Sequence, residues 1–425
     1  MTQGLALYKD FFEHHPPLFY FTINPLLYAF EGREALIALR LAMLPIALGI
    51  LGLVYALASE LRNRQAGVWA VFLLSTTILF VQKSIEIRPD VPALLLLLSA
   101  IYLLVSRPRS ALAYAGSGMA AACSLAYTPK TAFAIAGLLV ACALIHKRDE
   151  RRLRLGLAFA GGFTVPFVCL WGYFLSTGAV SEALFYNVQF NALVSYRYQW
   201  SNFSSSFLES LFRNFVFWCL SLIALGRSLL ARTDPGQRAI SGCALGAILG
   251  ILMLQVPMRQ YLMVIVSLLC VLLAVAVVDL GERLQEVKGA RFAGWILTVL
   301  AVVLLVPGSL GFAAERRITN DEQFAKLEYV WENTREDEAV FDCWSGLYLF
   351  RPHAFFYHFL GPDIRPTLDR IDRAILRRDL LKALRETKPR VAFADSNCRQ
   401  LPVEVRAYIR NHYKRGRYPE ILLPR

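Results

Sequence analysis

The chain has 425 residues, of which 56% are apolar and 18% charged, and its formal net charge is +13. The apolar share exceeds that of ordinary soluble domains, and the uncharged runs at 41–58 and 261–280 approach the roughly 20 residues that cross a bilayer. This composition predicts a polytopic membrane protein and argues against a large soluble helical core. A nucleic-acid-binding protein would need a basic groove interleaved with aromatic residues, which is absent, so we expect no nucleic-acid partner.

The chain begins with a polar stretch, YKDFFEHHPPL at 8–18, with no hydrophobic segment before it. Pro16 and Pro17 are expected to begin a short helix at the membrane surface, with Phe and Tyr side chains as interfacial anchors. Asp10 and Glu13 would then lie at the rim of a cavity.

The adjacent His14 and His15 suggest a metal site. Neighbouring side chains diverge on a helix or strand, however, so we favour packing at the interface, with one histidine hydrogen-bonded to substrate. No metal-ligand set is clear elsewhere, so no cofactor is assigned, although a divalent metal is compatible with the sequence.

Ten apolar segments follow, several of them short enough to indicate tilted or partly re-entrant helices. These segments are 36–58, 66–82, 90–105, 111–127, 130–145, 155–175, 207–229, 239–255, 260–279 and 292–313. Basic clusters occur in alternate loops, which the positive-inside rule places in the cytoplasm. These clusters lie at 62–64, 107–109, 146–154, 227–238 and 281–291. The loops at 83–90, 127–130, 176–206 and 255–260, together with both chain ends, then fall on the outer face.

Charged residues at the outer helix ends are candidates for a functional site, because charges at such depth are costly unless paired or functional. In KSIEIRPD (83–90), Pro89 suits the first turn of the next helix, so Asp90 is either an N-terminal cap or salt-bridge partner of Arg88, or a substrate or acid/base carboxylate. In the functional interpretation Arg88 is a phosphate ligand, since its planar guanidinium fits phosphate oxygens. Glu86 lies in the same loop and is a candidate substrate-binding residue.

Lys130, which follows Pro129 at the start of an apolar helix, has two interpretations: a lysine that extends toward the aqueous interface, or a point charge for a phosphate. Arg259 in VPMRQYL has the same two interpretations, and Tyr261 in that motif is a candidate substrate-binding residue. No nucleotide-binding loop or serine-hydrolase elbow is present in the sequence.

The C-terminal part, 314–425, is charged and is expected to form a small α/β domain. The pattern predicts strands at 339–344 and 390–395 and helices at 321–333, 369–386 and 402–413. In an oxidising compartment Cys343 and Cys398 could form a disulfide, but the sequence leaves their pairing open. The other six cysteines lie in apolar runs and are expected to act as small hydrophobic residues.

The sequence resembles the integral-membrane glycosyltransferases of the GT-C fold in five features that follow one another along the chain. These features are GLALYKDFFEHHPPLFY, RPDVPALLLLLSAIYLL, TPKTA at 128–132, MRQYL and an α/β tail. The sequence is most similar to the bacterial relatives of dolichyl-phosphate-mannose protein mannosyltransferase and of the lipid A aminoarabinose transferase. The resemblance implies an all-α membrane protein with about ten transmembrane helices and a C-terminal α/β domain. The expected divisions are a periplasmic loop at 1–33, a transmembrane domain at 34–313 and a periplasmic domain at 314–425, in a bacterial inner membrane.

The resemblance also implies a glycosyltransferase that moves a sugar from a polyprenyl-phosphate donor to a lipid, glycan or protein acceptor on the periplasmic side. Membrane lipids are further expected partners. Asp10 and Asp90 are then the candidate catalytic carboxylates. The candidate substrate-binding residues are Glu13, His14, His15, Glu86, Arg88, Lys130, Arg259 and Tyr261. Among them, Arg88 matches the family's outer Arg-Pro-Asp motif, and Lys130 and Arg259 match positions where basic residues would meet the donor phosphate. A leaving phosphate needs positive charge and an acceptor hydroxyl or amine needs a base, which agrees with these residue types.

This sequence departs from the family in one respect. Such enzymes carry an acidic motif after a first transmembrane helix, upstream of the segment that resembles GLALYKD. We expect that helix and motif before Met1; the alternative is a short N-terminus that is translocated unaided. Two other functions remain open: a transporter or flippase for a lipid-linked or polar solute, and an inactive relative that acts in an assembly. The sugar, the acceptor, the polyprenyl length and the oligomeric state leave no interpretable pattern.

Overall fold

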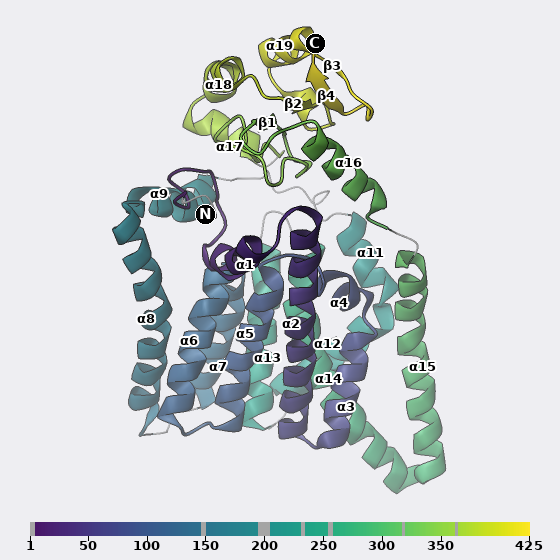
Figure 1. Cartoon of the computed structure of the whole chain (residues 1–425). Helices are drawn as coiled ribbons and strands as arrows, with labels where there is room; N and C mark the ends of the chain where they lie inside the picture. Colours follow the sequence, from purple (N-terminus) through teal and green to yellow (C-terminus); the bar gives the residue numbers. More distant parts are fainter. Residues whose placement is uncertain are drawn as a thin grey trace.

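The computed structural model describes residues 5–145, 150–193, 205–230, 234–253, 258–316, 319–361 and 364–425. It consists of a bundle of helices with a small α/β region, residues 319–425, above one end (Figure 1). The apolar runs are helical because a backbone surrounded by lipid must satisfy its own hydrogen bonds. The bundle elements are α1 (Leu18–Ala29), α2 (Gly32–Leu61), α3 (Arg64–Ser75), α4 (Ile78–Lys83), α5 (Asp90–Ser106), α6 (Ala111–Tyr127), α7 (Thr131–Ile145), α8 (Arg152–Thr177), α9 (Val180–Leu184), η1 (Phe185–Phe190), α10 (Asn191–Leu193), α11 (Ser205–Arg213), α12 (Phe215–Leu230), α13 (Pro235–Met253), η3 (Arg259–Tyr261), α14 (Leu262–Lys288) and α15 (Ala290–Glu315).

Each of the ten predicted apolar segments is occupied by helix, but their number as membrane spans is confirmed only in part. Among the described residues, five helices are long and apolar enough to cross a bilayer: α2, α8, α13, η3 with α14, and α15. A sixth span results if the bent pair α11 and α12 is counted as one. Helices α1, α5 and α7 are apolar but shorter, which agrees with the expectation that several segments are not ideal spans.

The segment 66–82, predicted as one span, is broken between α3 and α4. The hydroxyl groups of Thr76 and Thr77 donate to the carbonyls of Leu73 and Leu74, 3.1 and 2.7 Å away, and so compete with the helical ladder. Helix α15 packs directly on this break, where a β-carbon at Gly308 would lie only 1.8 Å from the Thr76 carbonyl oxygen. Small residues permit such close helix contacts in membranes.

The segment 207–229 was also predicted as one helix, and this is wrong: α11 and α12 meet at an angle of 84°. Asn214 lies at the bend, and its side-chain amide donates to the Ser210 carbonyl at 3.3 Å. The predicted loops at 146–154, 176–206, 227–238 and 255–260 lie partly outside the described residues.

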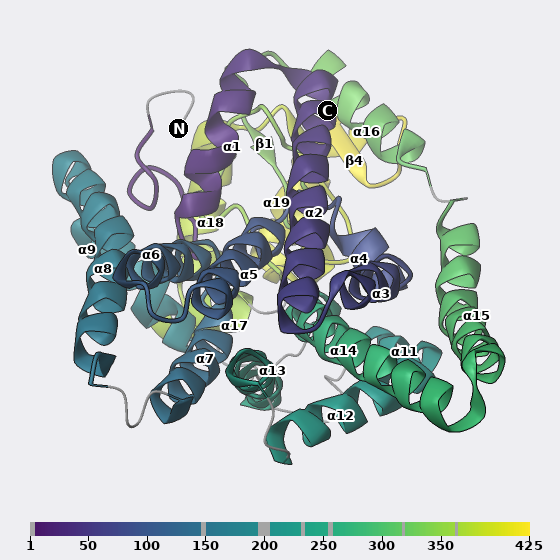
Figure 2. The same cartoon turned by 90° about the horizontal axis from the view of Figure 1, so that it is seen from below.

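Helix α14 is the most buried element of the bundle and lies beside α12 and α13, while α8 and α15 form opposite edges (Figure 2). At the end of the bundle far from the α/β region, Asp279 of α14 pairs with Arg62 at 3.0 Å and with Arg227 at 2.7 Å. Two of the basic clusters identified in the sequence therefore lie at the same end of the molecule.

The α/β region contains a four-stranded mixed sheet in the order β1-β2-β4-β3. Strand β1 runs parallel to β2, and the pairs β2–β4 and β3–β4 are antiparallel. The predicted strands and the helices at 321–333 and 402–413 are confirmed within a few residues, whereas 369–386 is divided into three pieces and the last two strands were not predicted. The elements are α16 (Asp321–Glu332), β1 (Val340–Phe341), α17 (Ile364–Ile371), η4 (Ile375–Asp379), α18 (Leu380–Thr387), β2 (Val391–Phe393), η5 (Cys398–Gln400), α19 (Val403–His412), β3 (Tyr413–Arg415) and β4 (Ile421–Pro424).

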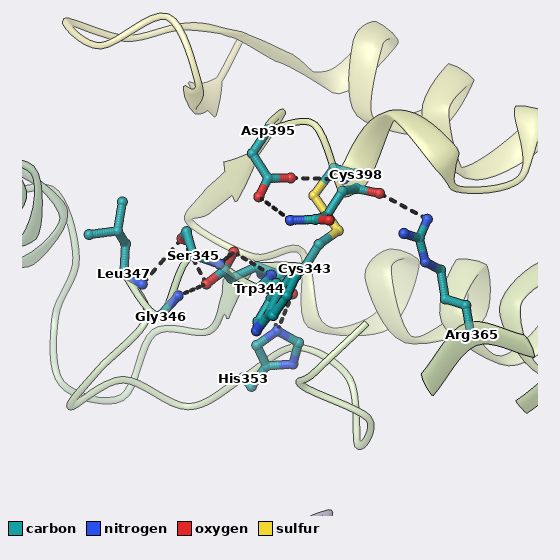
Figure 3. The surroundings of a disulfide bond; sticks show 11 residues. Cys343, Trp344, Ser345, Gly346, Leu347, His353, Arg365, Asp395 and Cys398 are labelled. Atoms are coloured by element: carbon teal, nitrogen blue, oxygen red, sulfur yellow. Dashed lines mark hydrogen bonds between the residues drawn. A yellow bond between two sulfur atoms is a disulfide. The ribbon is translucent and has the colours of Figure 1, made fainter. Parts of the chain in front are cut away.

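Cys343 and Cys398 form a disulfide with a Cα–Cα distance of 5.6 Å, so the pairing left open by the sequence is resolved. The bond links the end of β1 to the turn after β2 (Figure 3). The core of the α/β region also includes Leu7, Tyr8 and Phe12 from the start of the chain. The N-terminal segment is thus packed between the bundle and the α/β region.

Candidate functional site

Five charged side chains meet where α4 and α5 approach the start of α7, and we call them the Asp90 cluster. Asp90 is the first residue of α5, and its carboxylate lies 3.2 Å from Arg88 Nε and 3.9 Å from Lys130 Nζ. Glu86 lies 2.6 Å from Lys83 Nζ and 3.8 Å from Arg88 Nε. The salt bridge between Arg88 and Asp90, one of the alternatives that the sequence left open, is therefore present, and it belongs to a larger network that also includes Lys130.

Lys130 faces a pocket between α5, α7, α13 and α14. Its ammonium group lies 3.8 Å from the centre of the Tyr261 ring, a favourable cation–π geometry. Asp90, Phe133 and Gly250 also line this pocket. Lys130 is thus held between an aromatic face and a carboxylate, and its side chain is only 28% exposed.

Arg259 begins the short helix η3, whose other two residues, Gln260 and Tyr261, line the same pocket. The Nε atom of Arg259 is buried and has no hydrogen-bond partner among the described residues. A buried donor without a partner costs about 1–3 kcal/mol, so this atom is suited to an anionic ligand.

A second group, which we call the Glu13 network, comprises Glu13, His14, His15 and Tyr20. One oxygen of the Glu13 carboxylate accepts from the backbone N–H groups of His14 and His15, at 2.8 and 2.9 Å, and contacts His15 Nδ1 at 2.7 Å. The other oxygen accepts from the Tyr20 hydroxyl. Pro16 and Pro17 precede α1 as predicted, and this helix start brings Tyr20 back to Glu13.

The expectation that His14 and His15 diverge is wrong. Their ring centres lie 4.1 Å apart, and potential ligand atoms of Glu13, His14 and His15 lie within 4.8 Å of one another. The segment is neither helix nor strand here, so the alternation of side chains does not apply. The His15 carbonyl accepts from the Tyr8 hydroxyl at 2.7 Å, and the His14 carbonyl accepts from Asn191 Nδ2 at 2.7 Å, which fixes the irregular backbone. These three residues could hold a divalent metal.

The protonation of this network follows from its burial. Burial favours the neutral form of Glu13, but the charge and hydrogen bond of His15 outweigh it and hold the pKa of Glu13 well below its usual range. Burial, followed by the charge of His15, lowers the pKa of His14 to about 3. His14 is therefore neutral at pH 7, and its 3.7 Å approach to Glu13 is not an ion pair. The charge of Lys130 contributes to the same lowering, so the Glu13 network and the Asp90 cluster lie within electrostatic reach of each other.

Asp10 lies apart from both groups. It is exposed, and its carboxylate accepts from the Ala6 backbone N–H at 2.6 Å across a tight turn. The structure thus brings together Glu13, His14 and His15, and separately Glu86, Arg88, Asp90, Lys130 and Tyr261, but places Asp10 in neither set.

The α/β region covers the Glu13 network with aromatic side chains that the sequence did not indicate. The Phe12 ring lies 5.0 Å from Tyr357 and 5.9 Å from His358, and the His14 ring lies 6.1 Å from Phe359. Burial lowers the pKa of His358 to about 4, with an opposing contribution from the charge of Glu13. Tyr20 and His358 were missed as site residues. In the sequence, the one signal for His358 is the clustering of aromatic residues and histidines at 353–359 in an otherwise charged tail.

Comparisons with known proteins agree with this architecture. Residues 14–174 match the family model described as dolichyl-phosphate-mannose-protein mannosyltransferase. The structure is similar to ArnT from Cupriavidus metallidurans in the apo state, with a TM-score of 0.65 and 13% identity over 98% of this chain and 88% of that one. It is also similar to ArnT from the same organism bound to undecaprenyl phosphate, with a TM-score of 0.62, 11% identity and the same coverage.

A third similar structure is the archaeal oligosaccharyltransferase AglB from Archaeoglobus fulgidus, in complex with an inhibitory peptide and a dolichol-phosphate. Its TM-score is 0.59 at 11% identity, covering 90% of this chain and 62% of that one. No curated protein matches the sequence. The chain is therefore a multi-pass membrane protein with the fold of the GT-C glycosyltransferases, similar over residues 14–174 to the dolichyl-phosphate-mannose-protein mannosyltransferases.

Proposed function

We propose that this protein transfers a sugar from a polyprenyl-phosphate donor to an acceptor at the end of the bundle covered by the α/β region. The observation that carries the proposal is the convergence of Arg88 and Lys130 on Asp90, at a pocket bordered by Tyr261. Cations at the end of apolar helices suit a phosphate whose lipid tail lies in the bilayer. The two similar proteins support this assignment, since one was crystallised with undecaprenyl phosphate and the other was solved with dolichol-phosphate.

In the proposed reaction, an acceptor hydroxyl or amine attacks the anomeric carbon and the bond from that carbon to the phosphate oxygen breaks. The acceptor proton passes to a carboxylate, and polyprenyl phosphate leaves with the bonding electron pair. Lys130, Arg88 and Arg259 stabilise the negative charge that grows on the phosphate. The displacement occurs in one step, so the configuration at the anomeric carbon is inverted.

Two carboxylates are proposed as the base. Asp90 lies beside the proposed phosphate ligands, and it also holds Arg88 and Lys130 in place. Asp10 is exposed on the N-terminal turn, where an acceptor has access to it. Glu13 accepts four hydrogen bonds and has a strongly lowered pKa, both of which suit a positioning role better than that of a base.

The proposed organisation is a periplasmic loop at 1–33, a membrane domain at 34–313 and a periplasmic domain at 314–425, in a bacterial inner membrane. The basic loops identified in the sequence support this orientation through the positive-inside rule. Glu86 is proposed to orient Arg88, while the histidines of the Glu13 network border the acceptor side.

The test uses the full chain in lipid nanodiscs with radiolabelled undecaprenyl-phosphate sugars and a total envelope extract as the source of acceptors. Label should move into a lipid, glycan or protein fraction with release of undecaprenyl phosphate. Transfer should fall sharply in Asp90→Asn. A similar fall in Asp10→Asn would favour Asp10 as the base, whereas unchanged transfer in that variant would leave Asp90 in this role. Donor that is never consumed, but crosses vesicle membranes in a protein-dependent way, would instead establish the flippase alternative.

A further inference from the structure

Trp344 is an exposed aromatic residue on a rigid turn. Its side chain is 46% exposed, although its neighbours Asp342 and Cys343 are fully buried. The Asp342 carboxylate accepts from the backbone N–H groups of Trp344, Ser345 and Gly346 at 3.2, 3.0 and 2.7 Å, and Cys343 is bonded to Cys398 (Figure 3). The turn is therefore fixed before any ligand binds.

The position of Trp344 connects it to the Glu13 network. Its ring lies 5.2 Å from the ring of Phe359 in an edge-to-face arrangement, and Phe359 is stacked near His14 at 6.1 Å. A backbone hydrogen bond holds the two segments together, because the N–H of Leu360, next to Phe359, donates to the carbonyl of Cys343, next to Trp344, at 2.7 Å. Phe12, Tyr357, His358 and Phe359 form an aromatic wall that covers the Glu13 network, and Trp344 extends this wall through its contact with Phe359.

The segment that carries Trp344, residues 342–350, contains a single charged residue, Asp342. Among the described residues, no ion pair involves 342–350, and the single carboxylate of this turn is buried in hydrogen bonds to the backbone and Ser345. Trp344 and Val403 are the two large hydrophobic residues of the described α/β region that are strongly exposed. An exposed indole next to neutral polar groups suits a neutral ligand with an apolar face.

We propose that Trp344 is a stacking platform for a pyranose ring of a glycan acceptor. A pyranose presents several C–H groups on one face, and their partial positive charge is attracted to the electron-rich face of an indole. The sugar would stack on Trp344 with its acceptor group directed along the aromatic wall toward His14 and Glu13. The inference rests on the proposed function and deepens it, since it selects a glycan from the lipid, glycan and protein acceptors.

The alternative for an exposed tryptophan in a membrane protein is an anchor at the lipid headgroups. The bundle offers a matched control, because Trp295 of α15 is 62% exposed on the apolar surface of the helices. Loss of Trp295 should alter lipid contact without affecting sugar binding.

The first measurement uses the full chain in nanodiscs, without donor, and neutral trisaccharides (maltotriose and cellotriose) as probes in saturation-transfer NMR. We expect a signal at the sugar C–H groups whose apparent Kd weakens about tenfold in Trp344→Ala, recovers partly in Trp344→Phe and is unchanged in Trp295→Ala. The second measurement is fluorescence quenching by brominated lipids, which should drop in Trp295→Phe and remain unchanged in Trp344→Phe.

Absence of any trisaccharide signal, a signal independent of Trp344, or lipid quenching that depends on Trp344 would each overturn the proposal. Because no donor is present, this outcome is independent of whether the protein transfers sugar. If the wild type transfers label but Trp344→Ala leaves the KM for acceptor unchanged, the proposed function stands and the platform does not.

Discussion

Replacing Lys130 with methionine is expected to remove the strongest proposed contact with the leaving phosphate. Methionine keeps an unbranched side chain of similar length that can still lie on the Tyr261 ring, so the main change is the loss of charge. At an effective dielectric constant of about 20, two unit charges about 4 Å apart attract by about 4 kcal/mol.

The Lys130 side chain is 28% exposed and is shared with Asp90 at 3.9 Å, so the full attraction does not reach the phosphate. We expect a loss of about 2–3 kcal/mol in transition-state stabilisation, which corresponds to about a 30- to 150-fold lower kcat/KM. The assay is label transfer from undecaprenyl-phosphate sugar in nanodiscs, with thermal unfolding measured in parallel to confirm that the variant folds.

The matched control is Arg33→Gln, which removes a cation near the start of α2 that pairs with Glu328 of α16 and belongs to neither group of site residues. This variant should remain within about threefold of wild type, and Lys130→Arg should retain most of the activity. A folded Lys130→Met protein with activity within about threefold of wild type would refute the assignment of Lys130 as a phosphate ligand.

Three further predictions concern the rest of the site. Arg259→Gln should raise the KM for donor about tenfold with little change in stability, because the buried Nε atom has no partner to lose among the described residues. Burial lowers the pKa of His14 to about 3 and of His358 to about 4, so between those values and about 6.5 the unfolded chain binds more protons than the folded one. Stability should consequently fall as pH drops from 7 to 5, measured by protease sensitivity of the N-terminal segment, and His358→Phe should weaken this dependence. Changing both Cys343 and Cys398 to serine removes the covalent link that closes a loop of 55 residues. The loss of this constraint on the unfolded chain should lower the free energy of unfolding by about 4 kcal/mol. The denaturant midpoint of this variant should be lower than that of the wild type, and reducing agent should not lower it further.

The sequence was sufficient where the signal is local. Within the described residues, helices formed in each apolar run, and the positions of Arg88 and Asp90 on either side of Pro89 made their salt bridge one of the expected alternatives. The breaks in the helices were not visible in the same way. The division at Thr76 depends on hydroxyl groups that bind the backbone and on α15, more than two hundred residues later in the chain, packing against it.

The Glu13 network shows a second limit of sequence reasoning. The rule that neighbouring side chains diverge holds for regular backbone, but the backbone at His14 and His15 is fixed by Tyr8 and Asn191 in an irregular form. The approach of His358 likewise depends on the docking of the α/β region, a tertiary contact with no local sequence signal.

The packing of Phe12 against Tyr357 and His358 has a consequence for biogenesis. These residues are separated by nearly the whole chain, so the ribosome has released almost all of the protein before the contact can form. Until the α/β region has folded and docked, the aromatic residues near position 12 lack this cover and remain exposed. A chain that stops short of this region would display an uncovered aromatic patch, which chaperones and proteases can recognise. The contact of Phe12 with Tyr357 and His358 therefore also covers an aromatic surface that quality-control proteins could otherwise bind.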